Sequence, residues 1–222
     1  MTTAQVQRRF GEGPLSRTAA LIYTLLVVEL WFLLAIAPGL MSLVLLDRDA
    51  SNAPLVVLCA LPVAPALSAA LYALRNRGRD LTDLTPSAAF RRGYRMNLPA
   101  VLRIWLPWSA WMGIVAFSLA VPGWWTAALV VVAVVVALWL INALVITSLY
   151  AFRARDVARL AGYFLGRTPG VTLGNAGLLL VAAGITTFAS EAVLALLGSL
   201  LAAAFLRTSS GIRREIEARF IA

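Results

Sequence analysis

The sequence predicts an all-α protein, a bundle of helices that crosses a membrane several times. Hydrophobic residues make up 61% of its 222 residues and charged residues only 13%, whereas soluble domains are usually about 45–50% apolar and about 25% charged. The apolar residues form runs of about 20 or more, the length that a helix needs to cross a bilayer. These runs lack the alternation of a barrel strand, and helices satisfy their own backbone in lipid.

Four apolar runs each have the length of one span, and a fifth run is long enough for two. The fifth run, residues 171–206, is interrupted mainly by Glu191. It fits either one long tilted helix or a tight hairpin that turns near Ser190 and Glu191. The hairpin gives six spans and the single helix gives five. The six predicted spans cover about residues 19–46, 54–74, 98–121, 124–151, 171–189 and 191–206.

The placement of arginine favours six spans. All 19 cationic residues are arginine, and short cytoplasmic loops are rich in basic residues. If residues 1–18 are cytoplasmic, six spans place every arginine except Arg48 on the cytoplasmic side. Five spans would leave the basic amphipathic tail, residues 207–222, outside. We therefore expect a multi-pass membrane protein with both termini in the cytoplasm.

Three short basic segments are expected to form amphipathic helices at the cytoplasmic surface. The first begins at Thr85 and Pro86, a pair typical of a helix start. Such helices can lie in the interface with their apolar side in the bilayer and contact anionic lipid head groups. Alternatively, they form a docking surface for a cytoplasmic partner. The arginines on their basic faces include Arg91, Arg92, Arg95, Arg155, Arg159, Arg213 and Arg214.

The first two of these segments follow similar sequences, 78 residues apart. Residues 71–75 (Leu-Tyr-Ala-Leu-Arg) reappear at 149–153 as Leu-Tyr-Ala-Phe-Arg, and the same offset places Asn97 on Asn175. This pattern indicates either a duplicated helical hairpin or a chance similarity between apolar sequences.

The residue inventory excludes several kinds of chemistry. The chain has no histidine and no lysine, and Cys59 is its only cysteine. Histidine-based triads, Schiff-base lysines, disulfides and cysteine metal clusters are therefore absent. We expect a non-catalytic protein with no cofactor and no metal site. Because the arginines flank apolar runs, they indicate membrane topology, and we expect no nucleic-acid partner.

Glu29 is the most informative polar residue inside the predicted spans. It lies about ten residues into the first span, where a charged carboxylate costs on the order of 2–3 kcal/mol or more. Its candidate partners are Asn142, Tyr72 and Arg103. Three interpretations stay open: a hydrogen bond between helices, a carboxylate that binds a proton or a substrate, and a side chain that snorkels along lipid.

Prolines are expected to kink two spans, because proline removes a helix hydrogen bond. They are Pro62 and Pro65 in the second span and Pro107 in the third. Such kinks either pack helices or make room for a ligand. Trp105, Trp108 and Trp111 lie on roughly one face of the third span, which indicates packing or interface anchoring, or else a wall on which a sugar stacks.

The first half of the chain resembles the DUF624 family, also called the YesL-like family, of bacterial membrane proteins. The similar segments are Glu29-Leu30-Trp31, residues 61–72 and residues 89–97 (Ala-Phe-Arg-Arg-Gly-Tyr-Arg-Met-Asn). The family commonly has Asn-Leu-x-Trp where this chain has Glu29. The resemblance implies a multi-span protein that is often encoded near carbohydrate importers, and it implies no catalytic residues.

Together these observations predict a membrane accessory or regulatory protein that works with a carbohydrate ABC importer or a sensor. The alternative is a small-molecule transporter or channel that uses the kinked second and third spans and Glu29. The sequence does not specify an oligomeric state.

Overall fold

The computed structural model describes residues 14–46, 52–77, 85–119 and 123–219, and its regular secondary structure there is entirely helical. Five segments are long and apolar enough to cross a membrane, so the chain is a multi-pass membrane protein with the predicted helical fold. In chain order they are α2 (Pro14–Val44), α3 (Ala53–Cys59) with α4 (Val63–Arg75), α5 (Pro86–Leu119), α6 (Thr126–Leu149) and α8 (Pro169–Phe188).

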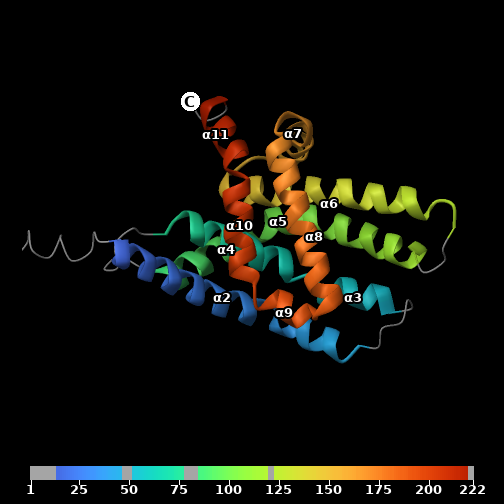
Figure 1. Cartoon of the computed structure of the whole chain (residues 1–222), viewed down its shortest axis with the longest axis horizontal. Helices are drawn as coiled ribbons and strands as arrows, with labels where there is room; N and C mark the ends of the chain where they lie inside the picture. The colour runs from blue at the N-terminus through green and yellow to red at the C-terminus, as the bar shows by residue number, and fades with distance from the viewer. Residues whose placement is uncertain (1–13, 47–51, 78–84, 120–122, 220–222) are drawn as a thin grey trace, which may run out of the picture.

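The fifth apolar run forms a hairpin rather than one long helix. After α8 the chain turns, and α9 (Glu191–Ala195) and α10 (Gly198–Thr208) lead it back along α8 (Figure 1). The predicted sixth span, 191–206, is therefore two short helices. At about 1.5 Å per residue, the 11 residues of α10 are too short to cross a bilayer alone. The prediction of a single continuous sixth helix was wrong.

The two basic segments that follow the related sequences differ in structure. The first expected amphipathic helix is the beginning of α5, which runs through Pro99 and Pro107 without interruption for 34 residues. The second is a separate helix, α7 (Ala154–Arg167), with Thr168 as its C-cap. Thr168 precedes Pro169 and is not helical, in keeping with the preference of residues before proline for non-helical conformations. The expectation of two matching short helices was wrong for the first loop.

The apolar faces of α7 and of α11 (Ser210–Arg219) pack inside the protein. Val157, Ala161 and Phe164 of α7 and Ile212 and Ile216 of α11 are at most 1% exposed. They join a core cluster with side chains of α5 and α6. The expectation that these faces lie in the lipid interface was wrong, because the bundle itself covers them.

The long helices α2, α5 and α6 run along the length of the molecule, and α8 and α10 cross their direction (Figure 1). A second core cluster joins α2, α4 and α10. Small residues of α4 allow this close packing, since Ala66, Ala69 and Ala70 have no exposed surface. Large apolar side chains elsewhere remain exposed, as expected where lipid is the solvent: Phe188 is 93% exposed and Leu180 73%.

Two predicted boundaries shift or cannot be placed. Residues 14–18, expected in the N-terminal segment, belong to α2. The rest of that segment and the loop with Arg48 lie outside the described residues.

Candidate functional site

Glu29 of α2 binds the N-terminal end of α10. Its Oε2 atom accepts a hydrogen bond of 2.6 Å from the backbone N–H of Ser199. Ser199 lies in the first turn of α10, and Leu197 at the N-cap offers no side-chain hydrogen bond. The first N–H groups of a helix lack partners within it, and a negative charge is stabilised there by the helix dipole. Glu29 therefore supplies from another helix the cap that α10 lacks.

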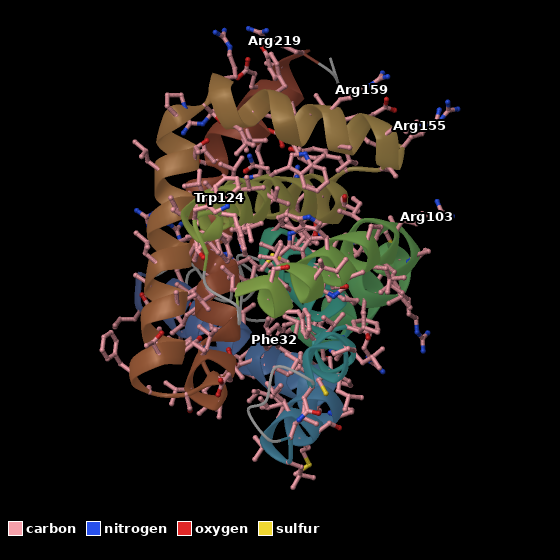
Figure 2. The ribbon with its side chains drawn as sticks, turned by 90° about the vertical axis from the view of Figure 1, so that its right-hand side faces the viewer. Phe32, Arg103, Trp124, Arg155, Arg159 and Arg219 are labelled. Carbon is pink, nitrogen blue, oxygen red and sulfur yellow. The ribbon has the colours of Figure 1, made fainter. Side chains whose placement is uncertain are left out.

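The three partners expected for Glu29 lie elsewhere. Asn142 bonds to Ala161 and Asn175, and Tyr72 packs against Gly93, where an added Cβ would lie 2.8 Å from the Tyr72 ring. Arg103 is exposed, and Figure 2 shows it at the edge of the molecule, apart from the buried Phe32, which lies one turn after Glu29. The prediction of these partners was wrong, while the hydrogen bond that Glu29 makes does join two helices.

The second carboxylate oxygen of Glu29 has a different environment. Oε1 is buried and bonds to none of the described groups. No described arginine forms an ion pair with this carboxylate. Its described stabilisation therefore comes from the backbone of α10, and a change at Glu29 acts directly on that helix.

A chain of buried polar side chains connects α6, α8 and α10. Asn175 donates to the Asn142 Oδ1 atom at 3.2 Å, and Thr208 donates to the Asn175 Oδ1 atom at 2.8 Å. Asn142 in turn donates to the Ala161 carbonyl of α7 at 3.4 Å. Asn142 and Asn175 are at most 1% exposed. This chain holds the α8–α10 hairpin against α6 and α7.

A second polar cluster joins α4, α5 and α6. Asn97 donates to the Ser68 hydroxyl and to the Ser148 carbonyl, each at 3.1 Å, and the Ser148 hydroxyl donates to Ser68 at 2.8 Å. Asn97 and Asn175, which the 78-residue offset relates, thus both bond to the preceding span. The residues to which the two asparagines bond are not related by the same offset, because the residue 78 positions after Ser68 is Ile146.

We expect Asn175→Ala to lower the free energy of unfolding by about 1–2 kcal/mol, because it leaves the buried Asn142 oxygen without its donor. Thermal unfolding in detergent measures this change. The matched control is Thr187→Ala in the same helix, whose exposed hydroxyl bonds to its own helix at Ala183. Equal loss in the two variants would contradict the role of the buried chain.

Helix α11 is fastened to the ends of α4, α6 and α7. Arg75 pairs with Glu217 at 2.8 Å, Tyr150 donates to Glu217 at 3.0 Å, and Arg167 pairs with Glu215 at 3.5 Å. The Arg75 guanidinium also lies over the Tyr150 ring, 4.9 Å from its centre. Burial raises the pKa of Tyr150 above its usual value, so the hydroxyl remains a donor at neutral pH.

Outward from these contacts, α7 and α11 present a basic surface. We call it the α7–α11 surface, after the exposed Arg155, Arg159, Arg214 and Arg219. Figure 2 shows Arg155, Arg159 and Arg219 projecting at the top, away from Arg103. Arg213 is not part of it, because it is partly buried and donates to the Leu206 carbonyl at 3.1 Å. The exposed acidic residues of this surface include Asp156 and Glu217. Glu217 pairs with Arg75.

The remaining predicted arginines lie on the first turns of α5. Arg91, Arg92 and Arg95 are all exposed. Arg91 also lies over the Trp31 ring of α2, 5.5 Å from its centre. These arginines belong to the same continuous helix as the third span. The bundle therefore holds them, rather than a separate interfacial helix.

The predicted prolines and tryptophans have different roles. Pro62 lies where the chain breaks between α3 and α4, as expected, and the buried Pro65 is in the first turn of α4. Helix α5 continues through Pro107. Trp105 is buried and stacks on Trp108 with ring centres 4.7 Å apart, so its ring is used in packing and is not open to a sugar.

Comparison with known proteins adds no relative. No family model, no curated protein and no solved structure matches this chain. The resemblance to the DUF624 family therefore stays a prediction, and the site must be interpreted from its own residues.

Two contacts of the site could not be found from the sequence. Ser199 binds Glu29 through its backbone, which no side-chain pattern reveals, and 170 residues separate the two. Arg75 and Glu217 are 142 residues apart. An available signal was the pair Leu197-Gly198, because a glycine in an apolar run often marks a helix boundary.

Proposed function

We propose that this chain is a non-catalytic accessory or regulatory protein of the bacterial cytoplasmic membrane. In this proposal both termini are cytoplasmic and the α7–α11 surface faces the cytoplasm. The protein works with a carbohydrate ABC importer or a sensor and docks to it through that surface. The carbohydrate link rests on the resemblance to the DUF624 family, and the docking mode rests on the geometry of α7 and α11.

One observation carries the docking mode. An amphipathic helix that lies on a membrane buries its apolar face in lipid, whereas the apolar faces of α7 and α11 are at most 1% exposed within the protein. Lipid is thus not needed to cover these helices. Their arginines project from a surface fixed by two ion pairs to α11, which favours recognition of an acidic partner surface.

Anionic lipid head groups would bind the same arginines, but less selectively. Charge attraction to a lipid surface is worth about 1 kcal/mol for each basic residue near it and requires no fixed geometry. A protein partner gains from groups that are already held in place, because less side-chain freedom is lost on binding. The core holds the α7 backbone that carries Arg155 and Arg159 in place, and this supports a partner protein.

The alternative, a transporter or channel that uses Glu29, has less support. A cavity does lie beside the break at Pro62. However, Glu29 Oε2 already binds Ser199, and the cavity has an almost entirely apolar lining. A polar solute needs hydrogen-bonding groups along its path, so we favour the accessory function.

The docking proposal predicts that Arg155→Gln with Arg159→Gln abolishes crosslinking of this protein to importer or sensor subunits in native membranes. The crosslinked subunits are identified by mass spectrometry. Arg103→Gln is the matched control, because it removes an exposed arginine of α5 that does not belong to the α7–α11 surface, and it should leave crosslinking unchanged. A parallel variant that replaces Arg91, Arg92 and Arg95 with Gln tests whether α5 contributes.

Three results would contradict the proposal. The first is recovery of the native protein without any such subunit. The second is a double variant that crosslinks as much as the native protein. The third is an Arg103 control that loses as much crosslinking as the double variant. Binding of the purified protein to vesicles with anionic lipid separates the two uses of the surface. If the double variant lost vesicle binding but kept its subunit crosslinks, the surface would serve lipid contact alone.

A further inference from the structure

A cavity lies where two helix breaks meet α2. The first break separates α3 from α4 at residues 60–62, and the second separates α9 from α10 at residues 196–197. The cavity has a volume of about 250 Å³, and α2, α3, α4, α9 and α10 all contribute to its wall. Interrupted helices leave space of this kind because no continuous row of side chains fills it.

The wall of this cavity is apolar. Among its described lining residues Glu191 alone is charged, and the others are aliphatic or aromatic residues, glycines and Cys59. Water occupies a cavity when it finds several polar partners, and apolar cavities stay dry or take apolar molecules. A sugar would leave its hydroxyl groups without partners here. The chemistry of the wall therefore selects hydrocarbon.

The cavity opens beside the lipid-facing surface. Val56 of α3 lines it and is also 41% exposed, and the adjacent Leu55 and Leu58 are 46% and 59% exposed. Leu196, next to the lining residue Ala195, is 59% exposed. In a membrane these side chains contact lipid tails, so hydrocarbon chains lie next to the opening.

The size of the cavity suits one chain. An apolar cavity of about 150 Å³ in another protein takes benzene, with its six carbons. By the same proportion, a cavity of about 250 Å³ holds about ten carbons. The lining includes the exposed Val56 as well as the buried Phe205, so a chain that enters beside Val56 would reach from the surface into the protein.

We infer that this cavity binds a single acyl chain of a membrane phospholipid, which enters between α3 and the α9–α10 turn. The inserted chain fills the space between the two helix breaks and contacts α2, α4 and α10. This site is separate from the α7–α11 surface and does not depend on the proposed docking function.

Photocrosslinking in nanodiscs tests the inference with the full-length chain. The probe is a phosphatidylcholine with a diazirine on one acyl chain, placed either near the ester or near the chain end, and mass spectrometry locates the crosslinks. We expect the deeper probe to label Leu67 and Phe205 and the shallower probe to label Val56 and Leu43. A diazirine-bearing decane that is not attached to a lipid serves as the comparison.

Filling the cavity should abolish the labelling of its wall. The variants are Ala60→Phe and Ala195→Phe, whose new rings would occupy the space. The matched control is Ala128→Phe on an exposed position of α6, which should keep wild-type labelling. The comparison of the two probes needs no variant, so the test remains decisive if a filled protein does not fold.

Labelling confined to exposed residues such as Leu58 and Leu196 would overturn the inference. Equal labelling of the wall in folded filled variants would do the same. If free decane labelled the wall while both lipid probes failed to do so, the cavity would take small apolar molecules and not lipid chains.

Discussion

Gly39→Ala is expected to destabilise the protein by more than about 1–3 kcal/mol, the usual cost of forcing an extra methyl group into a packed interior. A Cβ at Gly39 would overlap the carbonyl oxygen of Cys59 and approach Pro62 to 3.2 Å. The obstacle is backbone, which cannot rotate away as a side chain does. The helices α2 and α3 would have to separate, and the cavity between them would change shape.

Thermal unfolding in detergent, with size-exclusion chromatography to detect aggregation, measures the effect. Gly184→Ala is the matched control, because no neighbouring atom lies within 4 Å of the added Cβ. Since alanine is favoured over glycine within helices by up to about 1 kcal/mol, this variant should be as stable as the native protein or more stable. If Gly39→Ala unfolded at the native temperature, the close approach of α2 to α3 would be disproved.

Glu29→Ala is expected to lower stability by about 1–3 kcal/mol, because it leaves the Ser199 N–H at the start of α10 without its acceptor. Glu29→Gln should be close to the native protein, since the amide oxygen of Gln can accept the same hydrogen bond. Unfolding of the two variants in detergent, compared with the native chain, tests this difference. The contrast between the variants separates the loss of the acceptor from the loss of the charge.

Two outcomes would refute the capping role of Glu29. In the first, Glu29→Ala keeps native stability. In the second, Glu29→Gln loses as much stability as Glu29→Ala. The second result would indicate that the negative charge itself is required. Hydrogen exchange of the Ser199 amide gives an independent measure, and we expect it to rise in Glu29→Ala and to stay low in Glu29→Gln.

Much of the fold could be predicted because lipid imposes one simple requirement. The bounds of the apolar runs predicted the positions of α2, α6 and α8 to within a few residues, except at the start of α2. The arginine clusters also favoured a hairpin in the fifth run, and the hairpin is present. Both signals are local in sequence, and both follow from the cost of placing charge or bare backbone in hydrocarbon.

The errors share a physical cause. The amphipathic pattern of α7 and α11 shows that one face is apolar, but it does not distinguish lipid from protein as the cover. The position of Glu29 shows that a carboxylate needs a partner, but a backbone N–H has no side-chain signature. Both answers depend on how α10 and α11 fold back over α2, α4 and α6, which is set by packing between distant segments.

The dependence of α10 on Glu29 has a consequence for biosynthesis. The ribosome makes Glu29 long before it makes Ser199, so the first span is made before the α10 backbone that donates to its carboxylate. Until the last hairpin arrives, the Glu29 side chain lacks this hydrogen-bond donor and has to find another. A chain that stops before α10 would leave Glu29 without the Ser199 N–H.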